Sequence, residues 1–175
     1  MQFKQVFFTI LVSIAGVSWG QDVGLVLRNG QVNETALMEA LLPPSTRPTK
    51  SPIPQAVRTS KPQAHMLMTF ETNSAVLTPE SQKMLDALAR VMQADQLNTK
   101  SFAIEGHADP RGGEQSNLDL SQRRADAVVA YLSQTHSIRA SRLEAVGKGQ
   151  KELLNPNDPF APENRRVTVK TKVSE

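Results

Sequence analysis

The chain has 175 residues, a formal net charge of +3, a charged fraction of 21% and no cysteine. Its length suits one modest domain with appendages, and the lack of thiols excludes disulfides, thiolate metal sites and a cysteine nucleophile. Aromatic residues make up 5% of the chain, which is too few for the stacking surface that binds single-stranded nucleic acid. We therefore expect no nucleic-acid partner.

Residues 1–20 are typical of a secretory signal peptide. Lys4 precedes an apolar run over 6–17, and Ser18-Trp19-Gly20 places small residues before a cleavage site. We expect cleavage after Gly20, which leaves no integral membrane segment. The alternative is an uncleaved anchor, although the run is shorter than the ~20 residues that a spanning helix needs.

Residues 21–42 are expected to form a short N-terminal segment with one helix. Asn33 is a suitable helix cap, and the apolar run 37–42 ends at two prolines. The next stretch, 43–64, contains six prolines and four basic residues. Because proline fixes φ and removes a hydrogen-bond donor, we interpret it as a semi-extended basic linker. It either supplies reach alone or adds weak attraction to an anionic surface.

The remaining residues, 65–175, are expected to form the folded domain. Apolar residues alternate from Met66 to Glu71 and again from Val167 to Val173, as in strands. Thr78-Pro79-Glu80 supplies the cap, proline and acid that begin a helix. The expected elements are strand 66–71, a helix from 78, strand 102–106, a helix from Ser116 or Asn117, and strands 143–147 and 167–173.

One face of the last predicted strand is polar, with Arg166, Thr168, Lys170 and Lys172 in alternation. A strand with a solvated face belongs to a sheet that is covered on one side only, so the two helices pack on the other side. The predicted fold is an α+β open sandwich, ordered β-α-β-α-β-β, with a mixed sheet and both helices on one face.

The most informative motif lies between Glu105 and Ala125. It contains Gly106-His107-Ala108-Asp109, then Asn117, Leu120-Ser121 and Arg124-Ala125. In this spacing it resembles the signature of the OmpA-like domain family, the peptidoglycan-binding module of Gram-negative envelopes. The resemblance covers residues 66–173 and implies the same open sandwich.

The resemblance assigns ligand binding to Asp109 and Arg124. Peptidoglycan of such envelopes contains meso-diaminopimelate, whose side-chain end carries an ammonium and a carboxylate on one carbon. An aspartate accepts from the ammonium, and an arginine meets the carboxylate with two parallel hydrogen bonds. Taken alone, Asp109 before Pro110 also suits an Asx turn, and Arg124 suits a solvated helix charge. The joint spacing favours a site, with Arg124 rather than Arg123 facing the loop.

Five further positions are expected to support this site. Thr72 and Asn73 follow the first strand and line one wall, although Asn73 is equally a turn former. Ala108 stands where the family usually has Thr, which removes a hydroxyl and about 0.5–1.5 kcal/mol of hydrogen bonding. Asn117 is expected to cap the second helix rather than touch ligand, and Arg165 to reach the peptide part of the ligand.

The predicted function is non-covalent attachment of a periplasmic protein or envelope complex to the cell wall, including at the inner face of the outer membrane. We expect neither an enzyme nor a cofactor or metal, since His107-x-Asp109 offers two metal-capable groups and a catalytic zinc needs three. Peptidoglycan is the expected ligand, and an envelope or secretion-complex protein is the expected partner of 21–64. The alternative is a protein–protein adaptor with the same fold and an idle pocket.

Overall fold

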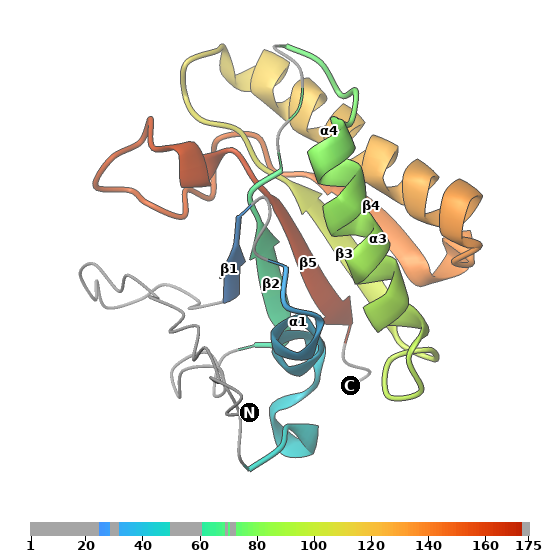
Figure 1. Ribbon diagram of the computed structural model, residues 1–175. Helices are drawn as coiled ribbons and strands as arrows, with labels where there is room; N and C mark the ends of the chain where they lie inside the picture. Colours follow the sequence, from blue (N-terminus) through green and yellow to red (C-terminus); the bar gives the residue numbers. More distant parts are fainter. Residues whose placement is uncertain (1–24, 29–31, 50–60, 69, 71–72, 173–175) are drawn as a thin grey trace, which may run out of the picture.

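The computed structural model describes residues 25–28, 32–49, 61–68, 70 and 73–172. The predicted signal peptide 1–20 lies outside these ranges, as do 50–60 of the predicted linker and Thr72 of the predicted site. The described part forms one mixed sheet with three α-helices (Figure 1). The strands are β1 (Leu25–Leu27), β2 (Gln63–Met66), β3 (Ser101–Gly106), β4 (Leu143–Gly147) and β5 (Val167–Lys172), and the helices are α1 (Glu34–Leu41), α3 (Pro79–Gln93) and α4 (Glu114–His136).

The sheet has the strand order β1-β2-β5-β3-β4. The central strand β5 is antiparallel to both of its neighbours, β2 and β3, whereas the outer pairs β1–β2 and β3–β4 are parallel. From β2 onward the chain follows the predicted order β-α-β-α-β-β, and Figure 1 shows α3 and α4 on the same face of the sheet. The predicted α+β open sandwich is therefore confirmed.

Two of the three helices begin where the sequence predicts. The Asn33 side chain accepts a hydrogen bond from the Ala36 amide at 3.2 Å, and the Thr78 hydroxyl accepts one from the Ser81 amide at 3.3 Å. Both are N-caps, which satisfy backbone donors that the first helical turn leaves free. The third helix, α4, begins at Glu114 after Gly113, so the predicted start at Ser116 or Asn117 is wrong.

The first strand of the predicted domain is displaced toward the N-terminus. β2 ends at Met66, where the prediction began the strand, and Phe70 forms an isolated bridge with Leu77. Both of these side chains pack against the core. Phe70 thus packs against the core from outside the named strands, and Gln63 lies in the sheet rather than in the linker.

The core lies between the sheet and the helices, and α1 contributes to it. Leu37 and Leu41 of α1 are fully buried, and the Thr171 hydroxyl of β5 donates to the Leu41 carbonyl at 2.7 Å. The segment before the linker therefore packs on the same core as the C-terminal part. The predicted helix faces of α3 and α4 are buried as well: Leu85, Leu88, Met92, Ala125, Val128 and Leu132.

The opposite face of the sheet is not solvated along its whole length. Thr168 and Arg166 are 1% and 6% exposed, respectively, so the predicted wet face is wrong at this end of β5. The Thr168 hydroxyl lies 2.9 Å from Nδ1 of His65 and 3.2 Å from Nε2 of His107. Arg166 Nη2 donates to the carbonyl of Glu152, because the loop after β4 folds over this end. His65, His107, Arg166 and Thr168 are called the polar cluster below.

The polar cluster gives the protein a predicted pH dependence. Burial, followed by the neighbouring Arg166, His65, Lys170 and Lys148, lowers the pKa of His107 to about 2. The unfolded chain takes up this proton below pH ~6.5 while the folded protein does not, so stability is full above ~6.5 and falls by about 1.4 kcal/mol per pH unit below it. Urea unfolding between pH 7.5 and 5 should show a shallower fall in His107→Gln than in wild type. Equal slopes for the two proteins would contradict a neutral buried His107.

Candidate functional site

Asp109 lies in the loop that follows β3, and the backbone of this loop is fixed on both sides. The Ala108 backbone amide donates to the Gly149 carbonyl at 2.8 Å, and the side-chain Nδ2 of Asn117 donates to the Asp109 carbonyl at 2.9 Å. The Asp109 side chain is 7% exposed. A carboxylate held in this way has little freedom to turn away from the partners around it.

Two arginines contact the Asp109 carboxylate. Arg165 Nη1 lies 2.7 Å from Oδ2, and Arg111 Nη1 lies 3.2 Å from the same oxygen. The other oxygen, Oδ1, accepts from the Arg111 backbone amide at 3.3 Å. This last hydrogen bond forms an Asx turn. Asp109 therefore both shapes the loop, as a turn former, and binds cationic side chains.

Arg124 lies in α4 and faces the loop that precedes α3. Its Nε donates to the Ser74 carbonyl at 3.0 Å, and its guanidinium carbon lies 4.7 Å from the centre of the Phe70 ring. Arg124 is half-buried and Arg123 is exposed. Burial lowers the pKa of Arg124 and the charge of Arg165 lowers it further, while Asp109 opposes both. The charges of Asp109 and Arg165 therefore both act on Arg124.

Glycines allow α4 to approach the sheet closely enough to make this site. A Cβ at Gly106 would clash with the Ser121 carbonyl, and one at Gly147 would lie 2.8 Å from the Gln122 amide nitrogen. The Ser121 hydroxyl accepts from the Gly149 amide at 2.9 Å, and Gly149 has a φ of +56°, which favours glycine. The predicted motif thus also contains the residues that pack α4 against the sheet.

Asn117 has a different position from the one predicted. It is 6% exposed and lies inside α4 rather than at its cap. Its side-chain Nδ2 donates to the Asp109 carbonyl, to the Gly112 carbonyl at 3.2 Å and to Gln150 Oε1 at 2.6 Å. The predicted cap is wrong because this side chain ties the Asp109 loop and the loop after β4 to the helix.

Of the other predicted positions, Arg165 and Ala108 lie beside Asp109. Arg165 is brought directly onto Asp109, and Ala108 is adjacent but buried, with its amide already bonded to Gly149. Asn73 is exposed and has a φ of +50°, which agrees with the turn-former interpretation. Thr72 lies outside the described residues.

Arg111 and Phe160 are two neighbours of the site that the sequence reasoning missed. Arg111 lies 5.5 Å from the centre of the Phe160 ring, measured from its guanidinium carbon, and its Nη2 donates to the Phe160 carbonyl at 3.2 Å. Phe160 is 49% exposed. The signal for Arg111 was its position two residues after Asp109, but nothing local in the sequence links it to Phe160.

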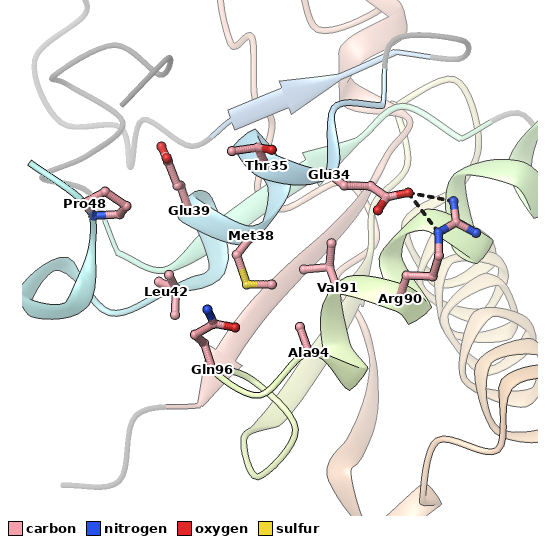
Figure 2. Close-up of a pocket in the computed structure, with 10 residues that line it drawn as sticks. All are labelled: Glu34, Thr35, Met38, Glu39, Leu42, Pro48, Arg90, Val91, Ala94 and Gln96. Carbon is pink, nitrogen blue, oxygen red and sulfur yellow. Dashed lines mark hydrogen bonds and ion pairs between the residues drawn. The ribbon is translucent and has the colours of Figure 1, made fainter. Parts of the chain in front are cut away.

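A second surface feature is a groove of about 330 Å³ between α1 and α3 (Figure 2). Its apolar lining includes Met38, which points toward Val91 in Figure 2. At one end Glu34 and Arg90 form an ion pair of 2.8 Å. Within the described ranges no cluster of three or more potential metal ligands occurs. The described helices also include none that is both long and apolar enough to cross a membrane.

Comparison with known proteins identifies the family. The profile of the OmpA family matches residues 69–166. This chain belongs to the OmpA family. It is 29% identical over 166 residues to an outer membrane protein A of Bordetella avium, covering 87% of this chain and 82% of that relative. It is 34% identical over 103 residues to a peptidoglycan-associated lipoprotein of Pseudomonas putida, covering 58% of this chain and 60% of that relative.

A solved structure supports the OmpA-family fold. The OmpA-like domain of FopA1 from Francisella tularensis matches with a TM-score of 0.53 at 21% identity, covering 65% of this chain and 75% of that one. At this level of identity the likeness concerns the fold. The relatives' names are those of outer-membrane and peptidoglycan-associated proteins, and neither is the name of an enzyme.

The glycine contact predicts a strong effect of one added methyl group. Gly106→Ala should lower the free energy of unfolding by about 1–3 kcal/mol or more, because the new Cβ meets helix backbone that cannot move alone. At Gly113 an added Cβ meets no atom within 4 Å, so Gly113→Ala should change it by less than about 1 kcal/mol. Chemical unfolding measures both. Equal stabilities for the two variants would contradict the close contact.

Proposed function

We propose that this protein binds peptidoglycan non-covalently through the meso-diaminopimelate of the peptide stem. Asp109 accepts from the ammonium of the diaminopimelate side chain, and Arg124 binds the carboxylate on the same carbon. In this way the domain attaches a periplasmic protein or an envelope complex to the cell wall. The relative named peptidoglycan-associated lipoprotein supports this assignment and the location that it implies.

The observation that carries the proposal is the state of the Arg124 guanidinium. Ser74 and Phe70 hold it in place, and within the described residues its hydrogen bonds use Nε alone. Nη1 and Nη2 are then the two donors that a carboxylate requires for parallel hydrogen bonds. The lowered pKa of Arg124 is the mark of a buried cation near other cations, which an incoming carboxylate would stabilise.

The proposed contacts also discriminate between wall types. A stem with lysine in place of diaminopimelate presents the ammonium but lacks the neighbouring carboxylate. Such a ligand would leave Arg124 half-buried and without its anion, and sites built to pair a polar group reject ligands that leave it unpaired. Binding of this kind needs no nucleophile or general base, so the proposal includes no catalysis.

Two substitutions test the proposed pair. Asp109→Asn keeps the side-chain shape and Arg124→Gln keeps a shorter polar side chain, and each removes one charge. Each should weaken co-sedimentation with diaminopimelate-type sacculi at least tenfold, on the order of the 1.5–3 kcal/mol of a charged hydrogen bond. Arg123→Gln is the matched control, since it removes the same charge from the exposed neighbour. Circular dichroism verifies folding of all three variants.

The contradicting outcomes are equally specific. If folded Asp109→Asn and Arg124→Gln proteins sediment like wild type, the site has been placed wrongly. If wild type binds lysine-type sacculi as strongly as diaminopimelate-type sacculi, the second carboxylate is not recognised.

The adaptor alternative has one observation in its favour, the groove between α1 and α3. It lies partly on residues 21–64, which we propose as the contact region for an envelope or secretion-complex protein. Deleting this region would remove the buried Leu37 and Leu41, so a substitution in the groove is the better test. Met38→Gln should abolish pull-down of an envelope partner and leave wall binding unchanged. An unchanged pull-down would count against the adaptor role of the groove.

A further inference from the structure

We infer that Arg111, seated on Phe160, binds a second carboxylate of the same peptide stem once the ligand ammonium has taken its place on Asp109. This inference rests on the proposed function and assigns a role to two residues outside the Asp109–Arg124 pair. It makes the site selective among diaminopimelate stems rather than only between wall types.

The first supporting observation is the charge around Asp109. Arg111 and Arg165 both contact its Oδ2, and Arg124 is coupled to Asp109 and Arg165 electrostatically. Two guanidinium groups thus contact one carboxylate, and a third, that of Arg124, is close enough to act on it electrostatically. The side-chain end of diaminopimelate is neutral overall, so its binding leaves the positive excess unchanged. A ligand with one more carboxylate complements it.

The second observation distinguishes the two ion pairs of Asp109. Arg165 lies closer, at 2.7 Å, and its side chain is 40% exposed; Arg111 lies at 3.2 Å and is 60% exposed. The Asp109 carboxylate is buried in both pairs, but water competes more strongly for the more exposed guanidinium, so its ion pair contributes less net stability. Arg111 is therefore the partner that an ammonium displaces at low cost, while Arg165 keeps the carboxylate in place.

The third observation is that Arg111 has a second support. Its Nη2 donates to the Phe160 carbonyl, and its guanidinium lies over the Phe160 ring. Phe160 is itself fixed, since its amide donates to Asp158 Oδ1 at 3.1 Å and Asn164 donates to the preceding Pro159 carbonyl at 3.0 Å. A displaced Arg111 thus stays beside the site, on an exposed aromatic ring that also offers an apolar surface to ligand methylenes.

Two carboxylates of a stem have the required chemistry. One is the α-carboxylate of D-glutamate, which is free because this residue is linked through its γ-carboxyl. The other is at the far end of diaminopimelate, and it is free in a tripeptide stem but forms an amide in a tetrapeptide stem. Both belong to the molecule whose ammonium contacts Asp109, so a single experiment can distinguish them.

Calorimetric titration with soluble stem peptides tests the inference. The ligands are the tripeptide L-Ala-γ-D-Glu-meso-diaminopimelate, the same peptide amidated at the D-glutamate α-carboxyl, and the tetrapeptide extended by D-Ala. Wild type should bind the plain tripeptide on the order of tenfold more tightly than one of the other two, as a charge-assisted hydrogen bond would give. The ligand that loses affinity identifies the carboxylate.

Two variants test whether Arg111 is the residue that binds this carboxylate. Arg111→Gln should bind the three peptides with equal affinity, at the level of the weaker wild-type complex, and Arg123→Gln should behave like wild type. Discrimination that persists in Arg111→Gln, or equal binding of all three peptides by wild type, would overturn the inference while leaving the Asp109–Arg124 pair in place. If wild type binds none of the peptides, and Asp109→Asn does not differ from it, the proposed function itself fails.

Discussion

The close contact of α4 with β3 and β4 is the constraint on which the rest of the site depends. Gly106 and Gly147 bring helix backbone against strand backbone, where a single Cβ would clash. This contact sets the distance between the loop after β3, which carries Asp109, and the helix that carries Arg124. Asn117 then bonds the loop to the helix, so the two charged groups are held by packing and hydrogen bonds rather than by attraction to each other.

The two faces of the sheet are covered in different ways. On the helical face, apolar side chains from α1, α3 and α4 form one core, and α1 joins it from the far side of a proline-rich stretch. On the other face, the polar cluster is buried under the loop after β4, and the pKa of His107 is lowered to about 2. That same loop region carries Phe160 and leads to Arg165, so the cover of the polar cluster and the edge of the ligand site are parts of one segment.

The features that the sequence predicted correctly depend on residues that lie close together along the chain. The caps at Asn33 and Thr78, the strand 143–147 and the burial of Ala125 all follow from spacing along the chain. The prediction failed where partners are far apart in sequence: Thr168 meets His65 across 103 positions, and Arg111 meets Phe160 across 49. Asn117 belongs to the same class, because its contact with Gln150 makes it a tie rather than a cap.

The central claim is that Asp109 and Arg124 bind the ammonium and the carboxylate that one carbon of diaminopimelate carries. The most direct measurement is an NMR titration of ¹⁵N-labelled protein with meso-diaminopimelate and, separately, with L-lysine. We expect saturable shifts of the Arg124 Nε–Hε signal and of the backbone amides of Ala108, Asp109 and Arg111 with meso-diaminopimelate, and much weaker shifts of Arg124 with lysine. Shifts confined to the groove between α1 and α3, or an Arg124 signal that does not move, would contradict it.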